Sequence, residues 1–193
     1  MTPADRPLLP DGPAPFAGYL DMFQRAPSVP LTIAAGVLLA VLVAALVPRR
    51  RVLTFLTGVA LAVVLGVTIV PSGGWTAFGL ENHALASIVA NVQPKAGDLT
   101  AWMTANDGPL NVVLFVPLGF FLALLLRRPI SAALLCVALS LAIECYQAAL
   151  TTRVATFADV VANGVGAGIG ALAAVVVLLL ARPAPPARVR VSR

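Results

Sequence analysis

The stretch NVVLFVPLGFFLALLL, residues 111–126, decides the fold of this chain. After Asn111 it contains no polar side chain, and with Leu110 it forms a long apolar run. A helix needs about 17–25 such residues to cross roughly 30 Å of hydrocarbon. The stretch therefore predicts a membrane-spanning helix.

Four further apolar runs of similar length accompany it: Val29–Val47, Val52–Val70, Ile130–Leu150 and Phe157–Ala181. Hydrophobic residues make up 60% of the 193 residues and charged residues only 11%. That charged fraction is less than half the roughly 25% usual in soluble domains. We therefore exclude a soluble fold and expect an all-α, polytopic integral membrane helix bundle with about five transmembrane helices.

The basic residues indicate how this bundle is oriented. Arg49, Arg50 and Arg51 follow the first run, Arg127 and Arg128 follow the third, and further arginines follow the fifth. If the N-terminus is outside, all of them lie on one side, which the positive-inside rule makes the cytoplasm. We attribute the net charge of +5 to this topology and to contact with anionic headgroups of membrane lipids. No nucleic acid partner is expected.

Five polar side chains interrupt the last three helices, and a sixth, Arg153, lies in the short turn between the last two. An intramembrane carboxylate costs roughly 2.5–3.5 kcal/mol at helix centre. Helical spacing places Gln147 near Glu144 on one helix, and Asp159 one turn from Asn163 on the next. With the N-terminus outside, all six fall in one layer near the outer surface, with Asn163 at a depth similar to Glu144. The set is Asn111, Glu144, Gln147, Arg153, Asp159 and Asn163.

The chemistry of these six residues is anion binding and hydrogen bonding. Arg153 can hold a phosphate or carboxylate through its planar guanidinium, and the amides both donate and accept. A desolvated Glu144 could serve as a general acid or base. The alternative is an interhelical polar clamp that binds no ligand. Ser140 lies one turn below Glu144 but has no histidine partner, which disfavours a serine hydrolase.

The sequence gives no indication of a metal or a cofactor. His83 is the only histidine of the chain and has no Cys, Asp or Glu at ligand spacing. Neither Cys136 nor Cys145 is expected to pair, because nine residues along one helix put them on opposite faces.

Small and helix-bending residues shape the third and fifth helices. Pro117 and Gly119 interrupt the third helix, where they either form a packing interface or open room around the polar residues. Four glycines at small-xxx-small spacing on the fifth helix predict a close helix approach, within the chain or in a homo-oligomer. They are Gly164, Gly166, Gly168 and Gly170.

This order of motifs resembles the VanZ-like family over about residues 52–181. The resemblance is carried by NVVLFVPLGFFLALLL, by Glu144-x2-Gln147, by Arg153-x5-Asp159-x3-Asn163 and by the glycine run. The family's namesake is associated with low-level resistance to the glycopeptide antibiotic teicoplanin. The resemblance implies a multi-pass protein of the bacterial plasma (inner) membrane, connected with the cell envelope or antibiotic resistance.

The chain then divides into four parts. Residues 1–28 form an outer leader with an interfacial helix, and residues 29–51 an additional transmembrane helix and basic turn. Residues 52–181 form the VanZ-like membrane domain, and residues 182–193 a basic cytoplasmic tail.

Our leading hypothesis is that the six polar residues bind a lipid-linked or anionic envelope group, or a glycopeptide, at the outer leaflet. One alternative is a membrane enzyme that modifies an envelope lipid with Glu144 or Asp159 as general acid or base. Another is a structural scaffold packed through the glycine face. A transporter is disfavoured, because the five spans show no internal repeat.

Overall fold

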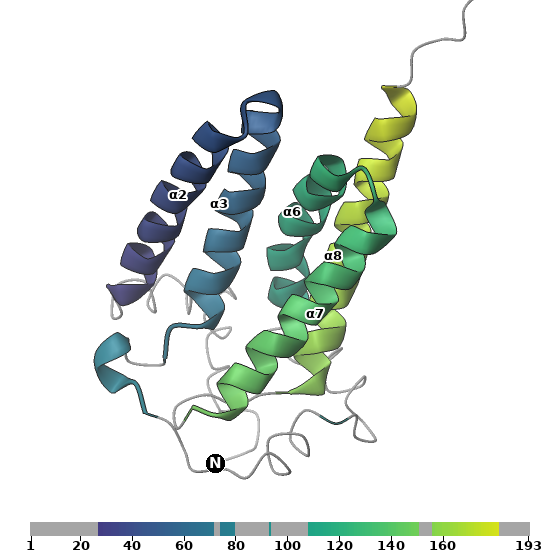
Figure 1. Cartoon of the computed structure of the whole chain (residues 1–193). Coiled ribbons are helices and arrows are strands. Elements are labelled where there is room, and N and C mark those ends of the chain that lie inside the picture. The colour runs from purple at the N-terminus through teal and green to yellow at the C-terminus, as the bar shows by residue number, and fades with distance from the viewer. Residues whose placement is uncertain (1–26, 72–73, 80–92, 94–107, 151–155, 182–193) are drawn as a thin grey trace, which may run out of the picture.

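The computed structural model describes residues 27–71, 74–79, 93, 108–150 and 156–181. Five helices cover most of these ranges, and each is long and apolar enough to cross a membrane (Figure 1). The helix bundle predicted from the sequence is confirmed, and each helix begins and ends within two residues of its predicted span. The helices are α2 (Ser28–Leu46), α3 (Arg51–Thr68), α6 (Gly108–Leu126), α7 (Pro129–Ala148) and α8 (Phe157–Leu180).

Several sequence predictions fall outside the described residues. They concern the interfacial helix of the leader, His83, Arg153 and the tail at 182–193.

Four of the helices share one core. Phe115 of α6 is fully buried and belongs to the same cluster as Val64 of α3, Cys136 of α7 and Ala167 of α8. The helix α2 packs chiefly against α3, on the far side of that helix from the core (Figure 1). Large apolar side chains such as Leu134 remain on the outside, 63% exposed. Such a surface suits lipid rather than water.

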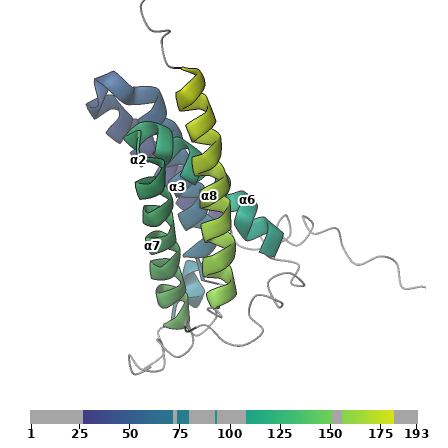
Figure 2. The same cartoon turned by 90° about the vertical axis from the view of Figure 1, so that its right-hand side faces the viewer.

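The closest helix contact is between α6 and α8, which cross each other (Figure 2). A Cβ atom added to Gly166 would stand 2.1 Å from the carbonyl oxygen of Val112. One added to Gly170 would stand 2.1 Å from that of Val116. Both glycines therefore let α8 lie directly on the backbone of α6.

The other residues predicted to shape these helices have different surroundings. Gly119 of α6 is buried, and an added Cβ would stand 2.4 Å from the carbonyl oxygen of Ala167 on α8. Pro117 lies inside the continuous helix α6 with its side chain exposed. Gly164 faces Val137 of α7, whereas Gly168 has nothing within 4 Å.

Charged residues separate to the two ends of the bundle. Within the described ranges, all arginines lie in the α2–α3 and α6–α7 turns or at the first residue of α3, and these share one end (Figure 1). We call this the arginine end. The two described carboxylates, Glu144 and Asp159, lie at the opposite end, where α7 ends and α8 begins. We call this the polar end.

Candidate functional site

The first feature of the polar end is the N-terminal cap of α8. Thr156 is the N-cap of α8, with extended backbone angles of φ −136° and ψ 144°. Its hydroxyl accepts a hydrogen bond from the amide of Asp159 at 3.2 Å and donates one to the Asp159 carboxylate at 2.8 Å. Such caps satisfy backbone donors that a helix start otherwise leaves without partners.

Glu144 of α7 completes this cap from the neighbouring helix. The backbone amide of Thr156 donates to Glu144 Oε2 at 2.9 Å. In an ordinary capping box the acidic residue three positions into the helix accepts this bond. Because Glu144 takes that role here, one oxygen of Asp159 is left to face α6.

Asn111, near the start of α6, uses that oxygen. Its side-chain amide donates to Asp159 Oδ1 at 2.5 Å. Asn111, Asp159, Thr156 and Glu144 therefore form one hydrogen-bonded chain across three helices. Glu144 is only 2% exposed, whereas Asn111 and Asp159 are half-buried. The positive end of the α8 dipole favours negative charge at this place.

Asn163 lies one turn deeper in α8. Its Nδ2 donates to the hydroxyl of Ser140 on α7 at 2.9 Å, and both residues are buried at 2% and 0% exposure. The other polar atom of the amide, Oδ1, is buried and has no hydrogen-bond partner among the described residues. A buried acceptor without a donor costs about 1–3 kcal/mol. This atom is therefore an anomaly in an otherwise well-bonded group.

Gln147 points to a different partner. Its Nε2 donates to the backbone carbonyl of Thr68 at 2.8 Å, near the end of α3. The last carbonyls of a helix have no partner within it. Gln147 therefore satisfies one of them and joins α7 to α3.

The structure thus distributes the six predicted residues among different contacts. It brings Asn111, Glu144 and Asp159 into one chain, and it places Asn163 level with Ser140, one turn deeper than the level of Glu144 expected from the sequence. Gln147 bonds to α3 instead, and Arg153 lies outside the described residues.

Sequence reasoning missed the roles of Thr156, Ser140 and Thr68. The pair Thr156 and Asp159 has the spacing of a capping box, so that signal was available. In the sequence, Ser140 stands out only as a possible nucleophile. Thr68 takes part through its backbone carbonyl, which no side-chain pattern reveals.

The described polar end is rich in hydrogen-bond acceptors. Two carboxylates and the Asn163 oxygen lie within two helical turns of one another on facing helices. No group of three His, Cys, Asp or Glu residues that could hold a metal ion occurs among the described residues. This arrangement suits a ligand that brings hydroxyl or amine donors.

A family model described as VanZ/LLP1 matches residues 59–179. That range covers more than half of the chain and every residue of the polar end described above. The chain belongs to the VanZ/LLP1 family. No curated protein and no solved structure matches it.

Together with the five apolar helices, the family identifies a multi-pass membrane protein. The VanZ/LLP1 match begins within α3, so that α2 and the first two turns of α3 lie outside it.

Proposed function

We propose that this VanZ/LLP1 protein is a bacterial inner-membrane protein of the cell envelope. Its polar end would lie at the outer leaflet and bind the headgroup of a lipid-linked envelope molecule. The observation that carries this proposal is the buried Asn163 oxygen, which has no hydrogen-bond partner among the residues that the structure describes. A donor on a bound headgroup would supply the missing bond.

A purely structural clamp explains less of the geometry. It accounts for the bonds from Asn111 to Asp159 and from Gln147 to the Thr68 carbonyl, which fasten helices together. Interhelical hydrogen bonds in membranes contribute only about 0.6–2 kcal/mol each. Burying carboxylates in a membrane costs more than such bonds contribute. A clamp also gives no reason for the buried Asn163 oxygen, which has no donor within the described part of the chain.

The chemistry of the polar end supports a headgroup that carries hydroxyl or amine donors. The carboxylate oxygens of Glu144 and Asp159 accept hydrogen bonds from Thr156 and Asn111, and the Asn163 oxygen is an acceptor too. A sugar attached to a lipid phosphate offers many such donors, and a glycopeptide such as teicoplanin offers sugars too. Arg153, between α7 and α8 in the sequence, would contact the phosphate, which a guanidinium binds through paired hydrogen bonds.

Binding to full-length protein in lipid nanodiscs tests the proposal. The probes are a sugar-bearing polyprenyl phosphate and the same polyprenyl phosphate without the sugar. Asn163→Leu should weaken binding of the sugar-bearing probe by about tenfold, the value of one lost hydrogen bond to a buried group. The protein should remain folded, because the substitution also removes the buried oxygen.

Ser140→Ala is the matched control. It removes the same interhelical bond from the other side and leaves the Asn163 oxygen in place. We expect it to retain binding. If both variants bind the sugar-bearing probe as well as the parent protein, the polar end is a clamp and the proposal is wrong.

Glu144→Gln separates binding from catalysis. Incubation of the parent protein with the sugar-bearing probe should leave the lipid unchanged. Formation of a product that Glu144→Gln abolishes would make the protein an enzyme instead. In cells, loss of teicoplanin tolerance in Glu144→Gln with unchanged membrane level of protein would support the link to glycopeptide resistance.

A further inference from the structure

The arginine end contains a cavity that is separate from the candidate site at the polar end. It measures about 400 Å³ and lies between the α2–α3 turn and the end of α6. This volume is within the range of about 300–1,000 Å³ found for ligand pockets. Its polar lining consists of four arginines: Arg49, Arg50, Arg51 and Arg127.

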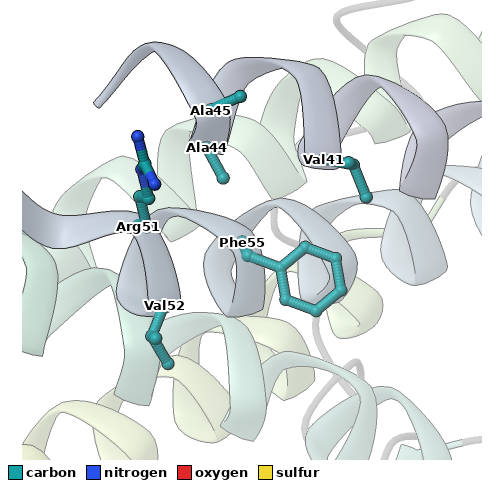
Figure 3. A pocket seen from close by; sticks show the side chains of 6 residues that line it. All are labelled: Val41, Ala44, Ala45, Arg51, Val52 and Phe55. Atoms are coloured by element: carbon teal, nitrogen blue, oxygen red, sulfur yellow. The ribbon is translucent and has the colours of Figure 1, made fainter. Parts of the chain in front are cut away.

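A second, apolar groove adjoins this arginine pocket. It measures about 420 Å³ and is lined by Val41, Ala44, Ala45, Arg51, Val52 and Phe55 (Figure 3). Arg51 and Val52 line both cavities. In Figure 3 the Arg51 side chain lies at one end of the groove and the Phe55 ring further along α3. A charged compartment therefore continues into an apolar one on a membrane-spanning surface.

No acidic residue of the described ranges balances the charge of the arginine pocket. Within the described ranges both carboxylates lie at the polar end. Arg50 donates from Nη1 to the carbonyl oxygen of Leu125, which ties the α2–α3 turn to the end of α6. The other three guanidiniums are exposed around the same cavity. Like charges held this close repel one another, and an anion in the pocket would offset that repulsion.

The backbone of Arg127 adds an independent observation. This residue follows α6 with a φ of 54°, in the left-handed region. Helices commonly end with a glycine in this conformation, because a Cβ atom disfavours it. The chain places an arginine there and directs its side chain to the pocket. A role of the guanidinium in binding would explain that choice.

We propose that the arginine end binds an anionic phospholipid, with the phosphate in the arginine pocket and one acyl chain in the groove of Val41 and Phe55. A headgroup with a net negative charge complements the four arginines. The apolar groove on the membrane-spanning surface fits an acyl chain, which a phospholipid has and a free phosphate does not. Basic pockets between transmembrane helices bind such lipids on the cytoplasmic side. The groove residues all precede residue 59, so that this feature is built outside the family match.

Native mass spectrometry of the full chain, and thermal unfolding in detergent with added lipid, test this proposal. The probes are phosphatidylglycerol, zwitterionic phosphatidylcholine and glycerol 3-phosphate. Phosphatidylglycerol should stay bound and raise the unfolding temperature, and the other two should not. If glycerol 3-phosphate competes as well as the lipid, the acyl groove plays no part and the proposal fails.

Two pairs of variants make the test specific to the site. Arg127→Gly should weaken phosphatidylglycerol binding by about fivefold, the value of one basic residue at an anionic lipid, while the glycine suits the backbone. Arg128→Gln removes the same charge from the adjacent residue, which does not line the pocket, and should leave binding unchanged. Equal losses in both would show general attraction to charge and would overturn the proposal.

The second pair addresses the groove. Ala45→Phe fills the groove and should weaken phosphatidylglycerol binding, whereas Leu42→Phe on the exposed surface of the same helix should not. Unchanged binding in Ala45→Phe would remove the acyl chain from the groove and overturn this part of the assignment.

Discussion

The close crossing of α6 and α8 gives the sharpest prediction of stability. In Gly166→Ala the new Cβ would stand 2.1 Å from the carbonyl oxygen of Val112, 2.9 Å from its carbonyl carbon and 3.0 Å from its Cα. All three are backbone atoms, so no side-chain rotation can relieve the contact. Reaching an ordinary contact of 3.4 Å requires the helices to separate locally by at least about 1.3 Å.

The expected loss in the free energy of unfolding follows from this displacement. Overpacking of a well-packed interior typically costs about 1–3 kcal/mol, and alanine regains up to about 1 kcal/mol of helix propensity over glycine. Gly168→Ala shares the propensity gain but meets no atom within 4 Å. The difference between the two variants therefore isolates the packing cost, about 1–3 kcal/mol against Gly166→Ala.

Equilibrium unfolding in mixed detergent micelles measures this difference. Gly168→Ala should be as stable as the parent protein or slightly more stable, and Gly166→Ala should be less stable. Because Asn111 adjoins Val112 on α6, the displacement should also weaken its bond to Asp159. If Gly166→Ala proves as stable as Gly168→Ala, α6 and α8 do not cross as described.

Two further predictions concern the polar end. Thr156→Val should lower the free energy of unfolding by about 1 kcal/mol, the value of an N-cap, and Thr156→Ser should restore it; equal stability of the two would deny the cap. Gln147→Leu should cost roughly 1 kcal/mol through loss of the bond to the Thr68 carbonyl. Gln147→Glu should lower the free energy of unfolding further than Gln147→Leu, because it places a carboxylate against that carbonyl. If unfolding in detergent shows Gln147→Leu to be the less stable variant, the contact with Thr68 is contradicted.

The helices could be predicted from the sequence because the cause is local. A run such as Val29–Val47 must cross the membrane as a helix to satisfy its backbone groups. Its length therefore fixes the element to within a residue or two, as α2 shows. The arginine-containing turns could be predicted in the same way, because charged residues mark the ends of each membrane span.

The contacts at the polar end depend on information that is not local. Spacing along one helix places Glu144 and Asn163 on their own helices, but the register between α7 and α8 depends on how the two faces pack. That register puts Asn163 opposite Ser140. The four glycines illustrate the same point, because their spacing is uniform while only Gly166 and Gly170 lie against the α6 backbone.

Photo-cross-linking with a lipid-linked sugar tests the proposed function most directly. A diazirine on the sugar of a polyprenyl-phosphate probe, in nanodiscs with the full chain, should label α7 between residues 140 and 147 and α8 between residues 156 and 163. Excess probe without the diazirine should abolish that labelling, and Asn163→Leu should reduce it. Labelling spread over exposed residues such as Leu134 and Leu172, unaffected by competitor, would contradict a binding site at the polar end.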